Sequence, residues 1–440
     1  MKYLRILPVL IAAVLLGSGC SSRQYLMPTP TVIAEGAHDP FALTTAAEQR
    51  STTPVFVVSG REPSGRTSPA RFYSNDRSRV LRLGRAELEI GAGLTWPELV
   101  DASRDPRRST GTRIEFSSFE EYGLLWASVP PPDLGFTRDW TAPDSSREPA
   151  SAFAEAINDQ LLSTGSDDAY IFVHGFNTDY TKNLGIAAEI WHYSGRRGAM
   201  LSFAWPSEHS LFEYQADKAN AAYATRQFRE LLRFLVEHTE IGRINIVAHS
   251  AGNPIVVEAM RDLRLMHYQA DQVSLQSATR IGRVVLAAPD MDLLRAINAT
   301  LDGFDECAES VVMYASTRDT ALSLSSMIFS DTRLGASVKR LSPEEQRALR
   351  SVQSFEAVDV SRAQKKHSTF LGHSYYHQNP WVSSDIGLYL TLGLTASERG
   401  LERDEKTGFW VFPPDYESRL QEHELGARSA QRENHHEQAH

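Results

Sequence analysis

Short apolar runs that alternate with helix-forming segments constrain this chain more than any other feature. From residue 169 onward six such runs predict strands, at 169–175, 198–206, 244–250, 283–289, 310–316 and 355–361. Strands of a parallel sheet are covered by helices on both faces, so they are apolar throughout and do not alternate with polar residues. The segment that ends at Glu237 has leucine and phenylalanine at helical spacing and predicts an amphipathic helix. The repeated strand–helix–strand order predicts an α/β fold, with a mostly parallel central sheet and helices on both faces.

The region before residue 169 has a different pattern. Antiparallel leading strands are predicted by β-rich runs that turn residues separate, at 55–60, 79–91 and 123–130. A connection rich in proline and aspartate follows at 130–149, and Ser151 is a candidate N-cap for a helix that extends to Leu162. The expected folded domain covers residues 53–395.

The first twenty residues have the layout of a secretory signal. Two basic residues precede an apolar run at 6–16, and three small residues separate this run from Cys20. The run is shorter than the ~20 apolar residues that a membrane-spanning helix needs. The small residues followed by cysteine resemble the bacterial lipobox, although Gly17 stands where the lipobox usually has leucine. This resemblance implies that residues 1–19 are removed as a signal peptide and that Cys20 is diacylated; the alternative is a plain secretory signal.

Either interpretation places the chain outside the cytoplasm. Residues 20–52 carry scattered prolines without hydrophobic periodicity and predict an extended tether, lipid-anchored through Cys20. Attached palmitate would hold the protein at a membrane of the bacterial cell envelope, and Ser21 favours the outer membrane, on its periplasmic side. Residues 396–440 are expected to form a C-terminal extension whose end is disordered.

Composition excludes several classes of function. The net charge of -10 would repel a phosphate backbone, so nucleic acid is not an expected partner. The two cysteines, Cys20 and Cys307, are too few for a disulfide framework or a cysteine-based zinc site, and Cys307 is expected to be a small buried residue. We expect neither a metal nor a cofactor, and the sequence does not determine the oligomeric state.

The five residues at 248–252, Ala-His-Ser-Ala-Gly, directly follow an apolar strand and precede an expected helix. This pattern resembles the nucleophile elbow of α/β-hydrolases, a sharp strand-to-helix turn that exposes the serine. The residues two before and two after the serine must be small so that the turn does not collide with itself, and Ala248 and Gly252 meet this requirement. Ser250 is therefore the candidate nucleophile, with His249 and Gly252 as supporting residues.

A serine hydroxyl needs an imidazole to take its proton and a carboxylate to orient that imidazole. In the α/β-hydrolase fold the acid usually follows the second strand after the nucleophile, and the histidine follows the next strand. The chain order therefore predicts Asp319 as the acid and His373 as the base. Asp290 follows the first strand after the nucleophile and is the alternative acid; otherwise it would cap the next helix. The rivals of His373 are His367 and His377.

The tetrahedral intermediate of acyl transfer carries an oxyanion that needs preorganised hydrogen-bond donors. The elbow offers the backbone amide of Ala251. The strand-end sequence His-Gly-Phe-Asn resembles the loop that supplies the second amide in this fold, here from Phe176. Gly175 permits close approach of the backbone. His174 and Asn177 are expected to brace this loop by hydrogen bonds and not to perform acid–base chemistry.

Five motifs in order along the chain, VHGFN, VAHSAGN, AAPDMD, YASTRD and GHSYYH, resemble a bacterial α/β-hydrolase family of unknown function that is esterase- or lipase-like. The resemblance covers roughly residues 53–390. It implies an α/β-hydrolase fold and a serine hydrolase with a Ser/Asp/His triad, but it names no substrate. Our leading interpretation is cleavage of a carboxylic ester through an acyl-enzyme, with a small-molecule or lipid ester as substrate. The alternative is a non-catalytic binding or scaffolding protein of the envelope that retains the fold.

Overall fold

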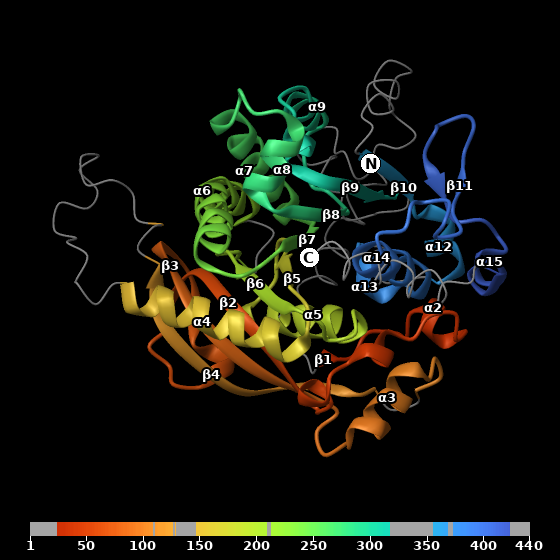
Figure 1. Cartoon of the computed structure of the whole chain (residues 1–440), viewed down its shortest axis with the longest axis horizontal. Helices are drawn as coiled ribbons and strands as arrows, with labels where there is room; N and C mark the ends of the chain where they lie inside the picture. The colour runs from red at the N-terminus through yellow and green to blue at the C-terminus, as the bar shows by residue number, and fades with distance from the viewer. Residues whose placement is uncertain are drawn as a thin grey trace, which may run out of the picture.

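The computed structural model describes residues 24–108, 111–125, 128, 147–208, 213–316, 355–367 and 373–422. The strands in these ranges are β1 Gln24–Tyr25, β2 Thr52–Pro63, β3 Tyr73–Ile90, β4 Arg113–Leu125, β5 Asp168–Val173, β6 Ala199–Ala204, β7 Arg243–His249, β8 Ile281–Ala287, β9 Ala308–Ala315, β10 Phe355–Asp359, β11 Glu402–Arg403 and β12 Trp410–Val411. These described strands form one sheet in the order β1-β4-β3-β2-β6-β5-β7-β8-β9-β10-β12-β11. The sheet extends across the molecule, from the N-terminal strands on one side of Figure 1 to the C-terminal strands on the other.

The predicted mixture of strand directions is confirmed. Neighbouring strands are parallel from β2 through β6, β5, β7, β8, β9 and β10 to β12. The leading strands β1, β4, β3 and β2 pair antiparallel, as does β11 with β12 at the far edge. Strand β4 begins at Arg113, well before the predicted run at 123–130. Its many charged and polar side chains hide the strand in the hydrophobicity pattern.

Side chains alternate between two cores, one on each face of the sheet. In β5, Ile171 and Val173 belong to one core, and Tyr170 and Phe172 belong to the other. The first face is covered by α4 Arg147–Thr164, α6 Tyr214–His238, α7 Asn253–Met266, α8 Gln272–Thr279 and α9 Leu293–Leu301. The second is covered by α2 Thr31–Ala34, α3 Trp96–Arg104, α5 Tyr180–Tyr193, α12 Ser361–Lys366, α13 Tyr375–Gln378, α14 Pro380–Leu392 and α15 Tyr416–Glu422.

The segment before β2 packs against the domain, so the prediction of an extended tether over residues 20–52 is wrong for the described part. Strand β1 adds to the edge of the sheet beside β4. In α2, Val32 and Ile33 are buried in the second core, and the backbone N–H of Val32 donates to Ser384 Oγ in α14 at 3.0 Å. These few apolar residues among prolines have no periodicity, so only their tertiary contacts reveal that the segment is folded.

A buried carboxylate holds the same N-terminal segment. Glu189 in α5 is 1% exposed. Its Oε2 accepts a hydrogen bond from the backbone N–H of Met27 at 2.9 Å, and its Oε1 lies 2.7 Å from Nδ1 of His377 in α13. Burying a carboxylate is costly unless it is paired and hydrogen-bonded. These contacts therefore fix the N-terminal segment relative to both α5 and α13.

Residues 396–422 also belong to the folded domain. Strand β12 extends the sheet beyond β10, and a fully buried ion pair joins this region to α14, because Arg399 Nε donates to Asp385 Oδ1 at 2.8 Å. The predicted domain limits of 53–395 are therefore too narrow at both ends. The last two dozen residues were expected to be disordered, but Tyr416–Glu422 form α15, in which Tyr416 and Leu420 are buried. Residues 423–440 lie outside the described residues.

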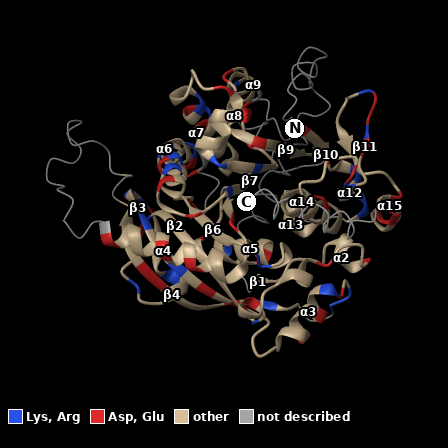
Figure 2. Ribbon diagram, in the orientation of Figure 1, with Lys and Arg blue, Asp and Glu red and all other residues tan. Residues whose placement is uncertain are grey.

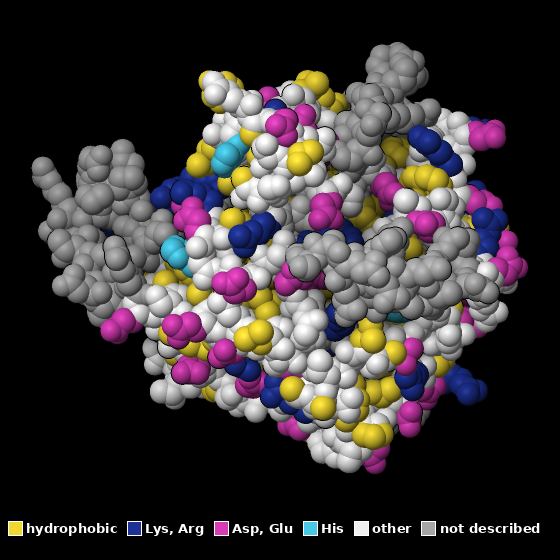
Figure 3. All heavy atoms as spheres, in the orientation of Figure 1, with side chains coloured by type: hydrophobic (Ala, Val, Ile, Leu, Met, Phe, Trp, Pro, Cys, Tyr) yellow, Lys and Arg dark blue, Asp and Glu magenta, His cyan; other side chains and the backbone are white. Residues whose placement is uncertain are grey.

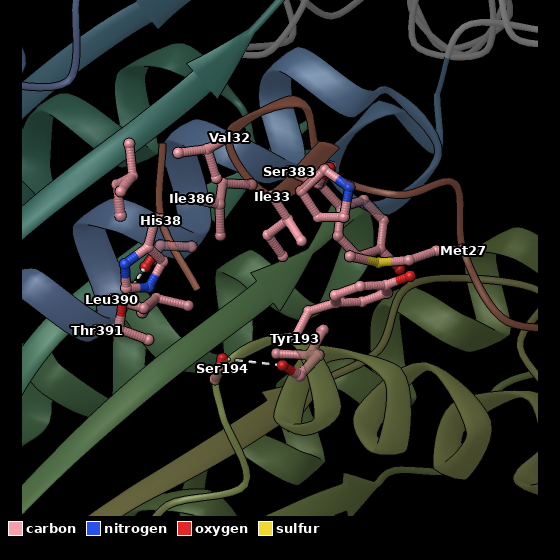
Figure 4. A pocket seen from close by; sticks show the side chains of 15 residues that line it. Met27, Val32, Ile33, His38, Tyr193, Ser194, Ser383, Ile386, Leu390 and Thr391 are labelled. Carbon is pink, nitrogen blue, oxygen red and sulfur yellow. Dashed lines mark hydrogen bonds between the residues drawn. The ribbon is translucent and has the colours of Figure 1, made fainter. Parts of the chain in front are cut away.

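A small apolar cavity remains between the N-terminal segment and the helices of the second face. Figure 4 shows Met27, Val32 and Ile33 from this segment facing side chains of α5 and α14 around it. Its volume of about 30 Å³ has room for about two water molecules. The cavity is too small to hold an ester substrate.

Charged side chains of both signs share the surface. Figure 2 shows Lys and Arg beside Asp and Glu along the helices, and Figure 3 shows them mixed with hydrophobic side chains on the same face. Around α7, Arg229 pairs with Asp262 at 2.8 Å and Arg264 pairs with Glu306 at 2.6 Å. None of the helices in the described ranges combines the length and the hydrophobicity that crossing a bilayer requires.

Replacing Ile33 by alanine tests whether the N-terminal segment is part of the fold. Because Ile33 is 6% exposed, the substitution should lower the apparent free energy of unfolding by about 2–4 kcal/mol, through lost apolar contacts and the space left behind. The control Leu162→Ala removes a side chain that is 81% exposed on α4, and its effect should stay below about 0.5 kcal/mol. Denaturant unfolding followed by tryptophan fluorescence measures both. Equally small effects would show that the segment contributes nothing to stability.

Candidate active site

The turn between β7 and α7 has the geometry of an elbow. Ser250 directly follows β7 and has a positive φ of 52°, a conformation that costs a non-glycine residue about 1–3 kcal/mol. A short 3-10 helix, Ser250–Gly252, leads straight into α7. The turn is held by Asn253, whose Nδ2 donates to the carbonyl oxygens of Ser250 at 2.8 Å and Ala287 at 3.0 Å. The backbone N–H of Asp290 also donates to the Ser250 carbonyl, at 3.3 Å.

Two glycines permit this turn to pack against the end of β5. A Cβ atom on Gly252 would lie 2.6 Å from the carbonyl oxygen of His174. A Cβ atom on Gly175 would lie 2.7 Å from Cβ of Ser250 and 2.9 Å from Nδ1 of His249. Carbon atoms do not approach other heavy atoms this closely without displacing them. Both positions therefore need glycine. For Gly252, the close contact with β5 explains why the residue two after the serine must be small.

His373 lies beside the candidate nucleophile. Its Nε2 is 2.8 Å from Ser250 Oγ, a hydrogen-bond distance suited to proton transfer. Ser250 is buried, and half-buried His373 immediately precedes the turn into α13. The rival histidines have other partners: His377 pairs with Glu189, and the ring of His367 packs 6.0 Å from that of Trp381. Of the three histidines, His373 is the one whose ring contacts the serine hydroxyl.

His249, the residue before the serine, contacts the main chain of His373. Its Nε2 lies 3.2 Å from the His373 carbonyl oxygen, and its ring stacks on Tyr376 with centroids 4.5 Å apart. Burial, reinforced by the nearby His373, lowers the pKa of His249 well below its usual range. A neutral imidazole can donate its single N–H to this carbonyl. His249 therefore supports His373 through the backbone, a role that the sequence did not specify.

Of the two candidate acids, the structure describes only Asp290. Asp319 lies outside the described residues. Asp290 follows β8 and is buried. It lies beside the elbow, since its backbone N–H donates to the Ser250 carbonyl. The expectation that Asp290 would otherwise cap the next helix is wrong, since Asp292 is the N-cap of α9 and accepts from the N–H of Arg295 at 3.1 Å.

The loop after β5, residues 174–178, is here called the HG loop. Nδ1 of His174 lies 2.8 Å from the carbonyl oxygen of Gly175, and Nε2 lies 3.1 Å from that of Trp205. The indole of Trp205 stacks on the His174 ring, with centroids 5.1 Å apart, and donates from Nε1 to the His174 carbonyl at 2.7 Å. His174 is fully buried, and both of its ring nitrogens lie within hydrogen-bond distance of a backbone carbonyl oxygen. This arrangement is that of a brace.

The other half of the HG loop is hydrogen-bonded to Ser207, which follows β6, and through it to Asp217 in α6. Asn177, with a positive φ of 53°, donates its backbone N–H to Ser207 Oγ at 3.0 Å, and Ser207 in turn donates to Asp217 Oδ2 at 3.0 Å. Burial raises the pKa of the Asp217 carboxyl from 3.8 to about 6. Neither Ser207 nor Asp217 was a predicted site residue. The Trp-Pro-Ser sequence at the end of β6 was the available signal for Ser207, whereas Asp217 has none.

The predicted donors of an oxyanion hole come from both segments. The amide of Ala251 belongs to the first turn after the nucleophile, and Phe176 occupies the middle of the HG loop, where its carbonyl accepts from Thr178 Oγ1 at 3.3 Å. The same close packing of Gly175 against Ser250 brings these two segments together.

No alternative reactive centre stands out among the described residues. Within them, no group of three or more His, Cys, Asp or Glu side chains could hold a metal ion. Cys307 is fully buried, and burial raises the pKa of its thiol to about 12. A thiol that is not ionised at neutral pH is a poor nucleophile, so Cys307 acts as an apolar core residue.

Comparison with known proteins identifies the family. A family model described as alpha/beta hydrolase of unknown function (DUF900) matches residues 149–389, more than half of the chain. The chain belongs to this family. The match includes both the elbow and His373, and the strand order of the sheet agrees with the α/β-hydrolase fold. The family has no established function, so membership names no substrate.

Solved structures with a similar arrangement include several esterases. Esterase B from Lactobacillus rhamnosis matches with 11% identity and a TM-score of 0.29, over 51% of this chain and 74% of that chain. An esterase from Pyrobaculum calidifontis matches with 12% identity and a TM-score of 0.30, over 51% and 77%. A predicted CIB-like hydrolase from Thermoplasma acidophilum matches with 11% identity and a TM-score of 0.30, over 52% and 87%. Similarities this distant carry no argument about activity. The search of curated proteins found no match.

The pH dependence of stability tests the environment of Asp217. Because its pKa is raised by folding, the contribution of this carboxyl is fully present below about pH 4 and is lost as the pH rises through about 6. Asp217→Asn keeps the neutral form at every pH. The free energy of unfolding of the variant, relative to wild type, should therefore rise by on the order of 1–2 kcal/mol between about pH 4 and pH 7.5. Urea unfolding at the two pH values measures it, and a difference that does not vary with pH would contradict the account.

Proposed function

We propose that this protein is a serine hydrolase that cleaves a carboxylic ester by way of an acyl-enzyme. The observation that carries the proposal is the 2.8 Å separation of Ser250 Oγ and His373 Nε2 at a strained strand-to-helix turn. A serine becomes a useful nucleophile only when a base lies within hydrogen-bond reach, and folds do not hold such strained turns without compensation. Membership in a family of α/β hydrolases supports the reaction class.

In the proposed mechanism, His373 takes the proton of the Ser250 hydroxyl while Oγ attacks the ester carbonyl carbon. A new C–O bond forms, and the carbonyl π electrons move to oxygen, where the backbone amides of Ala251 and Phe176 donate hydrogen bonds to the oxyanion. When the intermediate collapses, the ester C–O bond breaks and His373 gives its proton to the leaving alcohol. Water, deprotonated by His373, then attacks the acyl carbon. The bond between the acyl carbon and Ser250 Oγ breaks, His373 returns the proton to Oγ, and the carboxylic acid is released.

We assign the acid of the triad to Asp319. Its support is the chain order, since β9 ends at Ala315 and Asp319 follows in the connection to β10, with His373 in the connection after β10. Strands β8, β9 and β10 are adjacent and parallel, so their carboxyl ends lie at one edge of the sheet together with the end of β7. Asp290, after β8, is the alternative acid.

Hydrolysis of aryl esters of short and long acyl chains tests this assignment. Ser250→Ala and His373→Gln should each lower kcat by at least about 10³-fold, because the members of a triad act as a unit. Asp319→Asn should lower kcat by about 10²- to 10⁴-fold, because the imidazole loses its orientation. Liberated aryl alcohol, measured by absorbance, gives kcat and KM for each variant.

The matched control is His367→Gln, which changes a half-buried histidine that does not contact Ser250. It should retain kcat within about threefold, as expected of a substitution outside the catalytic unit. If Asp290→Asn has the larger effect and Asp319→Asn has none, the acid is Asp290. A folded wild type without turnover would contradict the hydrolase and favour a scaffolding protein.

We further propose that the protein is secreted and lipid-anchored through Cys20, on the periplasmic side of the outer membrane. The support is the signal-like sequence before Cys20. Cys20 lies seven residues before Met27, whose backbone N–H is bound by Glu189 in the folded domain. Seven steps reach at most about 25 Å, so the domain would lie close to the membrane surface.

Incorporation of labelled palmitate tests the anchor. Label should enter the wild type and the control Cys307→Ala, because Cys307 is buried in the core, and should not enter Cys20→Ala. Label in Cys20→Ala, or none in the wild type expressed in a Gram-negative host, would contradict anchoring at Cys20.

A further inference from the structure

Arg61 is buried beneath the HG loop. It lies in β2 and is 0% exposed. Its guanidinium donates from Nε to the carbonyl oxygen of Trp205 at 3.0 Å, from Nη2 to that of Thr178 at 2.9 Å, and from Nη1 to Asn75 Oδ1 at 2.5 Å. The three hydrogen bonds join β3, the end of β6 and the end of the HG loop. One side chain therefore links three segments that are distant in sequence.

The surroundings of Arg61 are unusual for a buried cation. Its side-chain hydrogen bonds to described residues all go to neutral oxygens, and the acidic groups that act on it from further away are Asp179, Asp217 and Glu208. Burial lowers the pKa of Arg61 to about 10, so the guanidinium stays charged at neutral pH. Burying a charge without a carboxylate partner is costly. A hydrophobic residue would fill the space of a purely structural position at lower cost.

Both ends of the HG loop depend on this guanidinium. At the start of the loop, His174 Nε2 lies 3.1 Å from the Trp205 carbonyl that also accepts from Arg61. At the end of the loop, the Thr178 carbonyl accepts from Arg61 directly. Phe176, whose amide is the proposed oxyanion donor, lies midway between these two fixed points.

We propose that Arg61 is a positioning residue for acyl transfer, which holds both ends of the HG loop so that the Phe176 amide keeps its direction toward the oxyanion. This inference rests on the proposed function. An oxyanion exists in the tetrahedral state and not in the bound ester, so a misdirected amide weakens binding of the former and leaves binding of the latter almost unchanged. Loss of Arg61 therefore acts on kcat and on tetrahedral adducts, with little effect on KM.

Arg61→Lys is the first test, because lysine keeps the charge but lacks the planar fork that reaches three acceptors. We expect kcat for an aryl ester to fall by about 10- to 100-fold, with KM within about threefold of wild type, since small displacements of a donor have costs of this size. The inhibition constant of phenylboronic acid, which forms a tetrahedral adduct with the serine, should rise by a similar factor. A merely structural role would not change this constant in a protein that remains folded.

Arg196→Lys is the matched control. Arg196 is also fully buried, and its Nη1 donates to the carbonyl oxygens of Arg50 at 2.5 Å and Thr52 at 3.1 Å, at the opposite end of β2. The substitution should lower the unfolding midpoint to a similar extent as Arg61→Lys, but it should leave kcat and the boronic acid constant unchanged.

Asn75→Ala is the second variant, which applies even if Arg61→Lys does not fold. It removes one acceptor of the guanidinium from a partly exposed position on β3. We expect kcat to fall by about 3- to 10-fold, with the boronic acid constant raised in parallel, because one of three fixing contacts is lost. Folded variants at Arg61 and Asn75 with unchanged kcat and inhibition constant would overturn the inference.

The two proposals fail in distinguishable ways. If the wild type neither hydrolyses the ester nor binds phenylboronic acid in a manner that Ser250→Ala abolishes, the proposed function fails and the inference fails with it. If the wild type is active and Ser250→Ala is not, the function stands, and the variants at Arg61 and Asn75 decide the inference alone.

Discussion

The contact between the ends of β5 and β7 is the constraint on which the site depends. Gly175 packs so closely against Ser250 that a Cβ atom there would lie 2.7 Å from that of the serine. This packing holds Ser250 in a left-handed conformation, which no isolated turn with a serine at that position would favour. The hydrogen bonds from Asn253 and Asp290 to the Ser250 carbonyl supply the compensation. Close packing and strain together aim the hydroxyl at His373.

The N-terminal segment and the candidate site share one set of buried contacts. Met27 is bound by Glu189, Glu189 by His377, and the preceding residue in α13, Tyr376, stacks on His249. His249 in turn contacts the main chain of His373. The segment that a lipid anchor would precede is thus packed against the elements that position the candidate base.

The fold and part of the site could be predicted because their signals are local. The apolar runs at 244–250 and 283–289 mark parallel strands by composition alone, and the small residues around Ser250 mark the elbow by spacing. The pairing of Ser250 with His373 followed from chain order in the fold, and the structure places the two side chains 2.8 Å apart. Asp319, by contrast, stays a prediction, because it lies outside the described residues.

The remaining parts of the site have no local signal. Arg61 reaches the Trp205 carbonyl across 144 positions, and His377 reaches Glu189 across 188. The local sequence around Arg61 and around His377 has no feature that predicts these contacts, and only tertiary packing gives the two residues a role. For the same reason the sequence predicted a tether at residues 24–50. Their few apolar side chains show no periodicity, and helices distant in sequence bury them.

Covalent labelling by a fluorophosphonate, followed by mass spectrometry of the intact protein and its peptides, tests the central claim most directly. The account predicts one adduct per chain, located on Ser250. It also predicts that His373→Gln slows labelling by at least about 100-fold, because the base that activates the hydroxyl is gone. A folded wild type that takes no label, or that takes it on another residue, would contradict the claim.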